Sequence, residues 1–220
     1  MLWHTLPRMK IIALVTQKGG SGKSSIASSL AVAATLAGEK VLALDLDPQG
    51  TLAEWAKLRK GAAPSVAYVP PNKSAQLGEL LSSAANNYSL AILDTPGADS
   101  PAAHNAMSAA DLCLVPLRPS RPDALGIKPT VDALIRGRKR FAFVLNQCPT
   151  VARSSRASEM AAGLETLGLL AEPPICSRAD FQDAYAAGQG VTEYAPHGKA
   201  AEEIRQLWAW LSNELKGSQT

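Results

Sequence analysis

The sequence predicts an α/β fold, in which helices cover both faces of a mostly parallel, twisted sheet. An apolar run at 11–15 indicates a buried strand, a glycine-rich loop follows at 17–25, and a helix is expected over 26–34. Two later apolar runs, 40–45 and 90–94, each end in aspartate and indicate further buried strands. Parallel strands present their carboxyl ends at one edge of a sheet, so we expect the loop and both carboxylates to meet there.

The glycine-rich loop has the context that phosphate binding requires, because it lies between a strand and the start of a helix. Glycines let backbone N–H groups turn inward around an anion, and the helix N-terminus adds partial positive charge there. Lys23 is placed to reach the terminal phosphates, and the Ser24 hydroxyl to bind Mg²⁺. A chance glycine-rich turn with two lysines is the alternative. The expected phosphate-binding residues are Gly19, Gly20, Ser21, Gly22, Lys23, Ser24 and Ser25.

Gln17 stands where the usual phosphate-loop pattern has glycine, and a second lysine, Lys18, begins the motif Lys-Gly-Gly-x-Gly-Lys-Ser. This deviant Walker A loop resembles that of the ParA/MinD family of ATPases. The resemblance implies a P-loop NTPase fold with ATP and Mg²⁺ as cofactors. It also implies that Lys18 reaches the nucleotide of a second subunit, as a catalytic and nucleotide-binding residue.

The first aspartate-ended strand runs into Asp45-Leu46-Asp47-Pro48-Gln49-Gly50, where proline and glycine force a turn. Alone, this segment is most simply an Asp-Pro-Gly turn. Placed one strand after the glycine-rich loop, it resembles the first switch of the family. The resemblance gives Asp47 the catalytic role of positioning the attacking water close to magnesium. Asp45 is then a nearby carboxylate that orders the loop.

The strand at 90–94 ends in Asp94 and is followed by Thr95-Pro96-Gly97. An apolar strand ending in aspartate is typical of the second half of a P-loop ATPase, where the carboxylate holds a magnesium-bound water. Such an aspartate is common in isolation, but this segment resembles the γ-phosphate-sensing switch of the family. The expected magnesium site therefore consists of Ser24, Asp47 and Asp94.

Between the two aspartate motifs, hydrophobic spacing predicts a helix that carries Leu52, Trp55 and Leu58 on one face. The expected elements are a helix over 51–60, a strand over 65–69, and a helix capped by Asn72 or Ser74 that ends at 86–87. These elements fit the alternation of strands and helices that a parallel sheet needs.

The second half of the chain continues this alternation. The expected elements are helix 102–110, strand 111–116, helix 123–135 interrupted at Pro129, strand 141–146, helix 154–167, a short last strand 173–175, and helix 198–216. In the last helix, Trp210 falls off the apolar stripe and is expected to be exposed. The run 136–140 is either a cationic helix end capped by Gly137 or a patch for DNA phosphates, and both can hold at once.

Base recognition is predicted from the resemblance alone. Asn146, at a strand end, fits the family position that reads adenine, although a loop-starting asparagine is a serious alternative. Relatives carry proline in the loop after the last strand, and here that proline is displaced to Pro174. Arg153 and Arg156 precede a helix, where they could contact either nucleotide or DNA.

The amino-acid composition limits the classes of protein to which the chain can belong. A chain of 220 residues with 46% hydrophobic residues can bury the core of a single domain. The net charge of +3 is compatible with nucleic-acid binding. Three scattered cysteines without a Cys-x-x-Cys pair suit a reducing cytoplasm and disfavour an iron–sulfur carrier. We expect no membrane span, and the last helix is too acidic to bind anionic lipid.

Three motifs in family order, over nearly the whole of 10–216, resemble the small ParA group, which includes ParF-like and VirC-like members. The resemblance implies an ATP-dependent homodimer that binds DNA nonspecifically and hydrolyses ATP slowly, stimulated by a ParB-like or cargo-adaptor protein. Such a protein is cytoplasmic and nucleoid-associated when ATP-bound. The expected organisation is a short extension at 1–9, one ATPase domain at 10–216 and a tail at 217–220. The alternatives are a MinD-like membrane-cycling regulator and an ATP-dependent small-molecule ligase.

Overall fold

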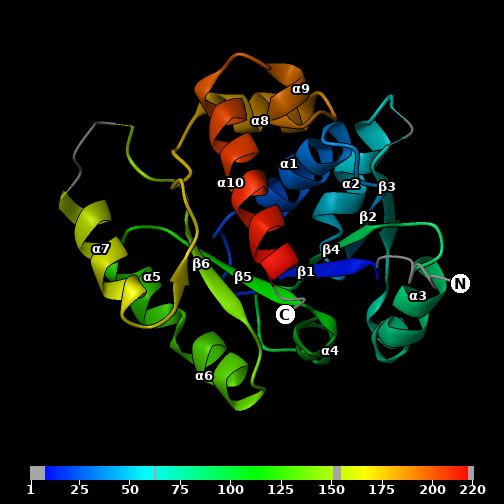
Figure 1. Cartoon of the computed structure of the whole chain (residues 1–220), viewed down its shortest axis with the longest axis horizontal. Coiled ribbons are helices and arrows are strands. Elements are labelled where there is room, and N and C mark those ends of the chain that lie inside the picture. The colour runs from blue at the N-terminus through cyan, green and yellow to red at the C-terminus, as the bar shows by residue number, and fades with distance from the viewer. Residues whose placement is uncertain (1–7, 62, 151–154, 218–220) are drawn as a thin grey trace, which may run out of the picture.

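A computed structural model describes residues 8–61, 63–150 and 155–217, and a seven-stranded parallel sheet organises them (Figure 1). Its strand order is β3-β2-β4-β1-β5-β6-β7. The strands are β1 (Lys10–Leu14), β2 (Val41–Asp45), β3 (Ser65–Tyr68), β4 (Leu90–Asp94), β5 (Leu112–Leu117), β6 (Phe141–Leu145) and β7 (Leu169–Leu170). The helices are α1 (Lys23–Leu36), α2 (Thr51–Leu58), the 3-10 helix η1 (Pro71–Gln76), α3 (Leu77–Ala84), α4 (Pro101–Ala109), α5 (Arg121–Gly126), α6 (Lys128–Arg136), α7 (Ser155–Glu165), α8 (Ala179–Ala186), α9 (Val191–Tyr194) and α10 (Lys199–Lys216). The predicted fold class is confirmed.

Helices bury both faces of the sheet, which is why its central strands are continuous apolar runs. Along β1, Ile12 and Leu14 point into a core shared with α1 and α10, whereas Ile11 and Ala13 point into a core shared with α3, α4 and α6. Figure 1 shows these two helix layers on opposite sides of the sheet.

The strand order gathers the predicted motifs at one edge. β4 lies between β1 and β2, and Asp94 is in register with Leu14 on one side and Asp45 on the other. The hydroxyl of Thr95 donates to the carbonyl of Leu14 at 2.7 Å and joins the ends of β4 and β1. The segments that follow β1, β2 and β4 therefore meet, as expected from a parallel sheet.

The helix predicted over 123–135 is instead two helices, α5 and α6, that meet at Ile127. Its start was placed too late, because Ser120 caps α5 by accepting the N–H of Asp123. Gly137 is the C-cap residue of α6, as predicted, but it does not adopt the left-handed conformation. It has a φ of −75°, and Arg138 takes the left-handed position with a φ of 51°.

Several finer predictions are wrong for identifiable reasons. The last strand is β7, because Leu169–Leu170 pairs with β6 before the chain reaches 173–175. Leu58 is 50% exposed, since the apolar stripe has rotated past it by the final residue of α2. Neither Asn72 nor Ser74 caps α3, because both lie within η1. Trp210 is half-buried and packs against the core on the α10 side.

Some predictions fall outside the described residues, namely those on residues 1–7, Arg153, residues 218–220 and the side chain of Arg156. At the N-terminal boundary, Met9 is buried and Arg8 forms an ion pair with Asp111. Within the described part of the chain, no helix combines the length and apolarity needed to cross a membrane.

Candidate functional site

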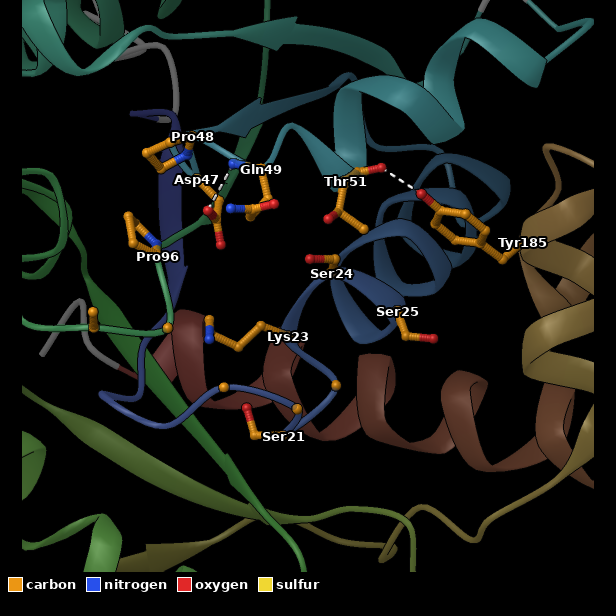
Figure 2. Close-up of a pocket in the computed structure, with 15 residues that line it drawn as sticks. Ser21, Lys23, Ser24, Ser25, Asp47, Pro48, Gln49, Thr51, Pro96 and Tyr185 are labelled. Atoms are coloured by element: carbon orange, nitrogen blue, oxygen red, sulfur yellow. Dashed lines mark hydrogen bonds between the residues drawn. The ribbon is translucent and has the colours of Figure 1, made fainter.

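A cleft of about 750 Å³ opens at the edge where β1, β2 and β4 end (Figure 2). The predicted glycine-rich loop forms one wall, and the segments after β2 and β4 form the other. The side chain of Tyr185 comes in from α8. The lining residues are Gly19, Gly20, Ser21, Gly22, Lys23, Ser24, Ser25, Asp47, Pro48, Gln49, Thr51, Pro96, Gly97, Ala98 and Tyr185.

The glycine-rich loop adopts a shape that side chains would prevent. Gly20 and Gly22 have φ values of 75° and 87°, in the left-handed region. A Cβ on Gly22 would lie 2.3 Å from Nδ2 of Asn146, so the loop can approach β6 only with glycine there. Gly22 is also the N-cap of the 14-residue helix α1, and the first three residues of α1 line the cleft, so a helix N-terminus meets the cleft as an anion site requires.

Neighbouring segments fix this loop at both ends. The N–H of Gln17 donates to the Thr130 hydroxyl at 3.0 Å. The Asn146 amide donates to the carbonyl of Ser21 at 2.7 Å, and the Gln147 amide donates to that of Gly20 at 3.3 Å. The loop is therefore held in a phosphate-binding shape by the protein itself.

Lys23 lines the cleft although it is buried, and the ionisable side chain of Asp94 is fully buried beside it at the end of β4. Burial lowers the pKa of Lys23, and the carboxylates of Asp94 and Asp47 oppose that shift. Burial raises the pKa of Asp94 to about 7, and the nearby Ser24 hydroxyl opposes it. Burial deprives both groups of contacts with water, and a bound ligand would supply polar contacts in their place.

The acceptors at this point suit magnesium. Both carboxylate oxygens of Asp94 are buried without a hydrogen-bond partner among the described residues, while the Ser24 hydroxyl is close by. Among the residues placed in the structure, no cluster of His, Cys, Asp or Glu could bind a metal alone. Magnesium at this point would be held by Ser24, Asp47 and Asp94 together with phosphate oxygens and water, and would neutralise charge on the phosphates.

The segment after β2 is ordered by its own carboxylates. Asp45, fully buried, accepts the N–H groups of Asp47 at 3.0 Å and of Ala53 at 2.8 Å, which fixes both the loop and the start of α2. Asp47 accepts the N–H of Gln49 at 3.0 Å and lines the cleft. The expected loop-ordering position of Asp45 is what the structure shows.

Lys18 does not line the cleft of its own subunit. Its ammonium forms an ion pair with the buried Asp123 at the start of α5. The same carboxylate also pairs with Arg118 at 2.7 Å and accepts the Ser120 hydroxyl at 2.8 Å. Burial alone would raise the pKa of Asp123, but the hydrogen bonds from Arg118, Lys18 and Ser120 outweigh it and hold that pKa at about 2. The signature lysine therefore lies beside the cleft in an intramolecular pair.

A smaller pocket of about 190 Å³ adjoins the cleft, with which it shares Gly22 and Ser25. Asn146 lines it, so this side chain both supports the loop and faces the pocket. Pro174 is exposed and is not among the lining residues, although its loop reaches the pocket two residues later. The pocket is lined by Gly22, Ser25, Ile26, Asn146, Gln147, Cys176, Ser177, Arg178, Phe181 and Gln182.

Three residues of the site were not foreseen from the sequence, namely Thr130, Asp123 and Tyr185. Each acts through a partner far away in the chain, which no local pattern reveals. Asp123 alone had a visible signal, because a serine three residues before an acidic residue predicts a capped helix start. That signal does not predict an ion pair with Lys18.

Comparison with known proteins agrees with this geometry. A sequence profile of the CobQ/CobB/MinD/ParA nucleotide binding domain matches residues 12–191. Protein ParA of Rhizobium radiobacter is 27% identical over 194 residues, which is 82% of this chain and 84% of that protein. Maintenance of carboxysome distribution protein A of Gloeobacter kilaueensis is 37% identical over 127 residues. This match covers 57% of each chain, so the chain spans little more than half the length of that relative.

Solved structures share the fold at low sequence identity. A Cyanothece McdA variant in complex with ATP has a TM-score of 0.74 at 16% identity, covering 95% of this chain and 96% of that one. The septum site-determining protein MinD of Pyrococcus horikoshii, with Mg-ADP, has a TM-score of 0.75 at 19% identity, covering 96% and 99%. Fold, loop and sequence profile lead to the same family. This chain belongs to the CobQ/CobB/MinD/ParA family of nucleotide-binding domains.

Proposed function

We propose that the protein is an ATPase of the ParA type, which dimerises on ATP and uses hydrolysis to position DNA or a protein cargo. One observation carries this proposal. The phosphate loop and Asp47 line a single cleft, Asp94 is buried directly behind it beside Ser24 and Lys23, and Lys18 lies just outside the cleft on the same edge of the sheet. A nucleotide held in this cleft has its phosphates among these groups and leaves Lys18 available to a second copy.

The roles that we propose for the residues of the cleft follow from their charges. The N–H groups of the loop and the Lys23 ammonium bind the phosphates, because only a cationic surface lined with N–H groups can hold several negative charges. Asp47 orders the attacking water. Asp94 holds a water of the Mg²⁺ shell, for which its unpartnered oxygens are suited.

Lys18 supplies a cation in trans in this proposal. Two subunits facing each other across their clefts would each place Lys18 on the nucleotide of the other, where developing negative charge needs a positive group. Leaving Asp123 does not strand a buried charge, since Arg118 and Ser120 remain bound to that carboxylate. The lysine can therefore exchange partners at low cost.

The proposed partners are nonspecific DNA and an adaptor protein. Support comes from relatives named for chromosome partition and for carboxysome distribution. The basic run at 136–140 offers cations, of which Arg136 and Arg138 are exposed. The proposed location in the cell is the cytoplasm, with the ATP-bound form associated with the nucleoid.

The test compares ATP binding, dimerisation and turnover in two variants. Lys18→Ala should bind ATP with affinity within about twofold of the unmodified protein, yet remain a monomer and lose hydrolysis by at least about 100-fold, since the trans cation is absent. Asp47→Ala should instead form a stable ATP dimer that does not turn over. Light scattering and phosphate release measure these outcomes.

Lys73→Ala is the matched control, because Lys73 is exposed on η1 and lies outside the cleft. This variant should behave like the unmodified protein. Full turnover by Lys18→Ala would exclude the trans lysine, and a monomeric Asp47→Ala protein with ATP and Mg²⁺ would contradict the dimer. Absence of ATP binding in the unmodified chain would overturn the function itself.

A further inference from the structure

We propose that Tyr185 is a positioning residue that couples occupancy of the small pocket to the loop carrying Asp47. This inference rests on the proposed nucleotide-binding function and adds a residue for which the motifs give no role. Tyr185 lies on α8, one turn beyond the residues by which that helix lines the small pocket, and its ring reaches the cleft (Figure 2).

The contact that transmits the coupling is a single hydrogen bond. The Tyr185 hydroxyl donates to the carbonyl of Thr51 at 2.5 Å. Thr51 is the first residue of α2 and directly follows the turn from Asp47 to Gly50. The start of α2 and the end of this turn therefore depend on where α8 holds the tyrosine.

Three further hydrogen-bonded contacts join α2 and its C-cap residue Arg59 to the segment after α8. The indole N–H of Trp55 donates to the carbonyl of Gln189 at 3.2 Å. Arg59 binds the carbonyl of Gly188 at 3.2 Å and the carboxylate of Glu193 at 2.7 Å. The backbones also approach closely, since a Cβ on Gly188 would lie 2.5 Å from the carbonyl of Leu58. α2 is thus fastened along its length, and Tyr185 provides the bond at the end nearest Asp47.

The other end of the connection lies in the small pocket. Phe181 and Gln182 line that pocket, and residues three and four positions apart lie on one face of a helix. The pocket adjoins the phosphate cleft at Gly22 and Ser25, so a nucleotide with its phosphates on the loop has this pocket within reach of its base. A base packed against α8 would influence the position of Thr51 through the hydrogen bond from Tyr185.

This arrangement predicts that the loop can distinguish a complete nucleotide from its phosphates alone. ADP fills both the cleft and the small pocket, whereas pyrophosphate fills only the cleft. Hydrogen exchange of the backbone amides of 51–56 reports the start of α2 directly, because the N–H groups of Ala53 and Glu54 bond to Asp45 and Gly50 there.

In the unmodified protein, ADP should slow exchange of these amides roughly three- to tenfold more than saturating pyrophosphate does, an amount that one hydrogen bond can supply. In Tyr185→Phe, which loses only the hydroxyl, ADP and pyrophosphate should protect them equally. Tyr194→Phe is the matched control, since Tyr194 is 43% exposed on α9 and outside both pockets.

Equal protection by ADP and pyrophosphate in the unmodified protein would overturn the inference, and so would a difference that persists in Tyr185→Phe. A purely structural tyrosine would speed exchange with and without ligand and leave the difference between ADP and pyrophosphate intact. If the unmodified chain binds ADP in calorimetry while these outcomes fail, the coupling is wrong and nucleotide binding stands. If it binds neither ADP nor ATP, the proposed function fails first.

Discussion

Asp123 is the residue on which Lys18 depends. Its carboxylate is buried at the start of α5 and remains ionised because Arg118, Lys18 and Ser120 surround it. In the proposed dimer, this ion pair would keep the Lys18 ammonium out of the cleft until a second subunit binds. The interaction is intramolecular, so it should be strongest in the monomer.

Replacing Asp123 with asparagine should change stability in a pH-dependent way. The pKa of this carboxyl falls from 3.8 to about 2 on folding, so its stabilisation is present above pH 4 and is lost as pH falls toward 2. Asp123→Asn should therefore cost on the order of 2 kcal/mol at pH 7 and little near pH 2. Urea unfolding across this pH range measures the difference.

Asp132→Asn, at a half-buried position on α6, is the matched control for the loss of one carboxylate. A constant difference between Asp123→Asn and the unmodified chain from pH 7 to pH 2 would contradict the buried ion pair. In that case Lys18 would not be held within its own subunit.

At the scale of elements, the end of α6 contains an unusual cap. Arg138 occupies the left-handed position, where glycine is preferred, while the Lys139 N–H donates to the Leu134 carbonyl at 2.9 Å and closes the helix end. A side chain in this conformation is strained, because Cβ crowds the backbone. The basic run thus carries a small cost at this helix end.

Arg138→Gly should stabilise the protein by about 0.5–1 kcal/mol, because glycine adopts the left-handed conformation without that strain. Arg136→Gly is a matched control that removes the same charge from the last residue of α6, and it should destabilise, since glycine is unfavourable within a helix. Thermal unfolding compares them. Equal shifts in both variants would mean that charge, and not backbone conformation, sets the effect.

The strands could be predicted far better than the boundaries of the helices. Central parallel strands are buried on both sides, so 11–15, 40–45 and 90–94 appear as apolar runs that few other elements produce. β7 has only two residues and no such run. The break falls at Ile127, two residues before Pro129, which stands in the first turn of α6 and not inside one continuous helix. Local pattern identifies an element when burial dictates its composition, and fails when a tertiary contact sets its ends.

The candidate site divides in the same way. The phosphate loop, Asp47 and Asp94 were predicted because each stands at or just after the end of a strand in a recognisable motif. Thr130, Asp123 and Tyr185 were missed because each meets its partner only after the sheet has formed. The roles assigned to the motif residues stay predictions until nucleotide binding is measured.

At the scale of the whole molecule, the parallel sheet separates two kinds of surface. Strand C-terminal ends form the cleft, whereas the run 136–140 precedes β6 and therefore lies at the opposite edge. Part of this run is already engaged, because Lys139 donates to the Ser108 carbonyl and Arg140 pairs with Glu214. Binding to DNA phosphates would rely on the exposed cations and on the two copies that a dimer supplies.

DNA binding should therefore require both the nucleotide and low salt. Fluorescence anisotropy of a random-sequence duplex should show tight binding with a slowly hydrolysed ATP analogue, and at least about tenfold weaker binding with ADP or without nucleotide. Raising salt from about 50 to 200 mM should weaken the complex steeply, since counterions are released when phosphates are contacted. The same titration with Lys18→Ala distinguishes the contribution of dimerisation to DNA binding from the contribution of the positive charges on each monomer.

Equal DNA binding in all nucleotide states would mean that the surface of a monomer is sufficient for DNA binding. No binding in any nucleotide state would remove DNA from the proposed partners, leave the ATPase proposal in place, and make the basic run a cationic helix end.

The bracing of the phosphate loop has a consequence for how the protein distinguishes ATP from ADP. Thr130, Asn146 and Gln147 already hold the loop in shape, so binding a nucleotide there costs little conformational entropy. A preorganised surface binds the phosphates that ATP and ADP share without changing shape. In the proposed ATPase, the loop would confer affinity, and the segments after β2 and β4 would be the parts free to respond to the third phosphate.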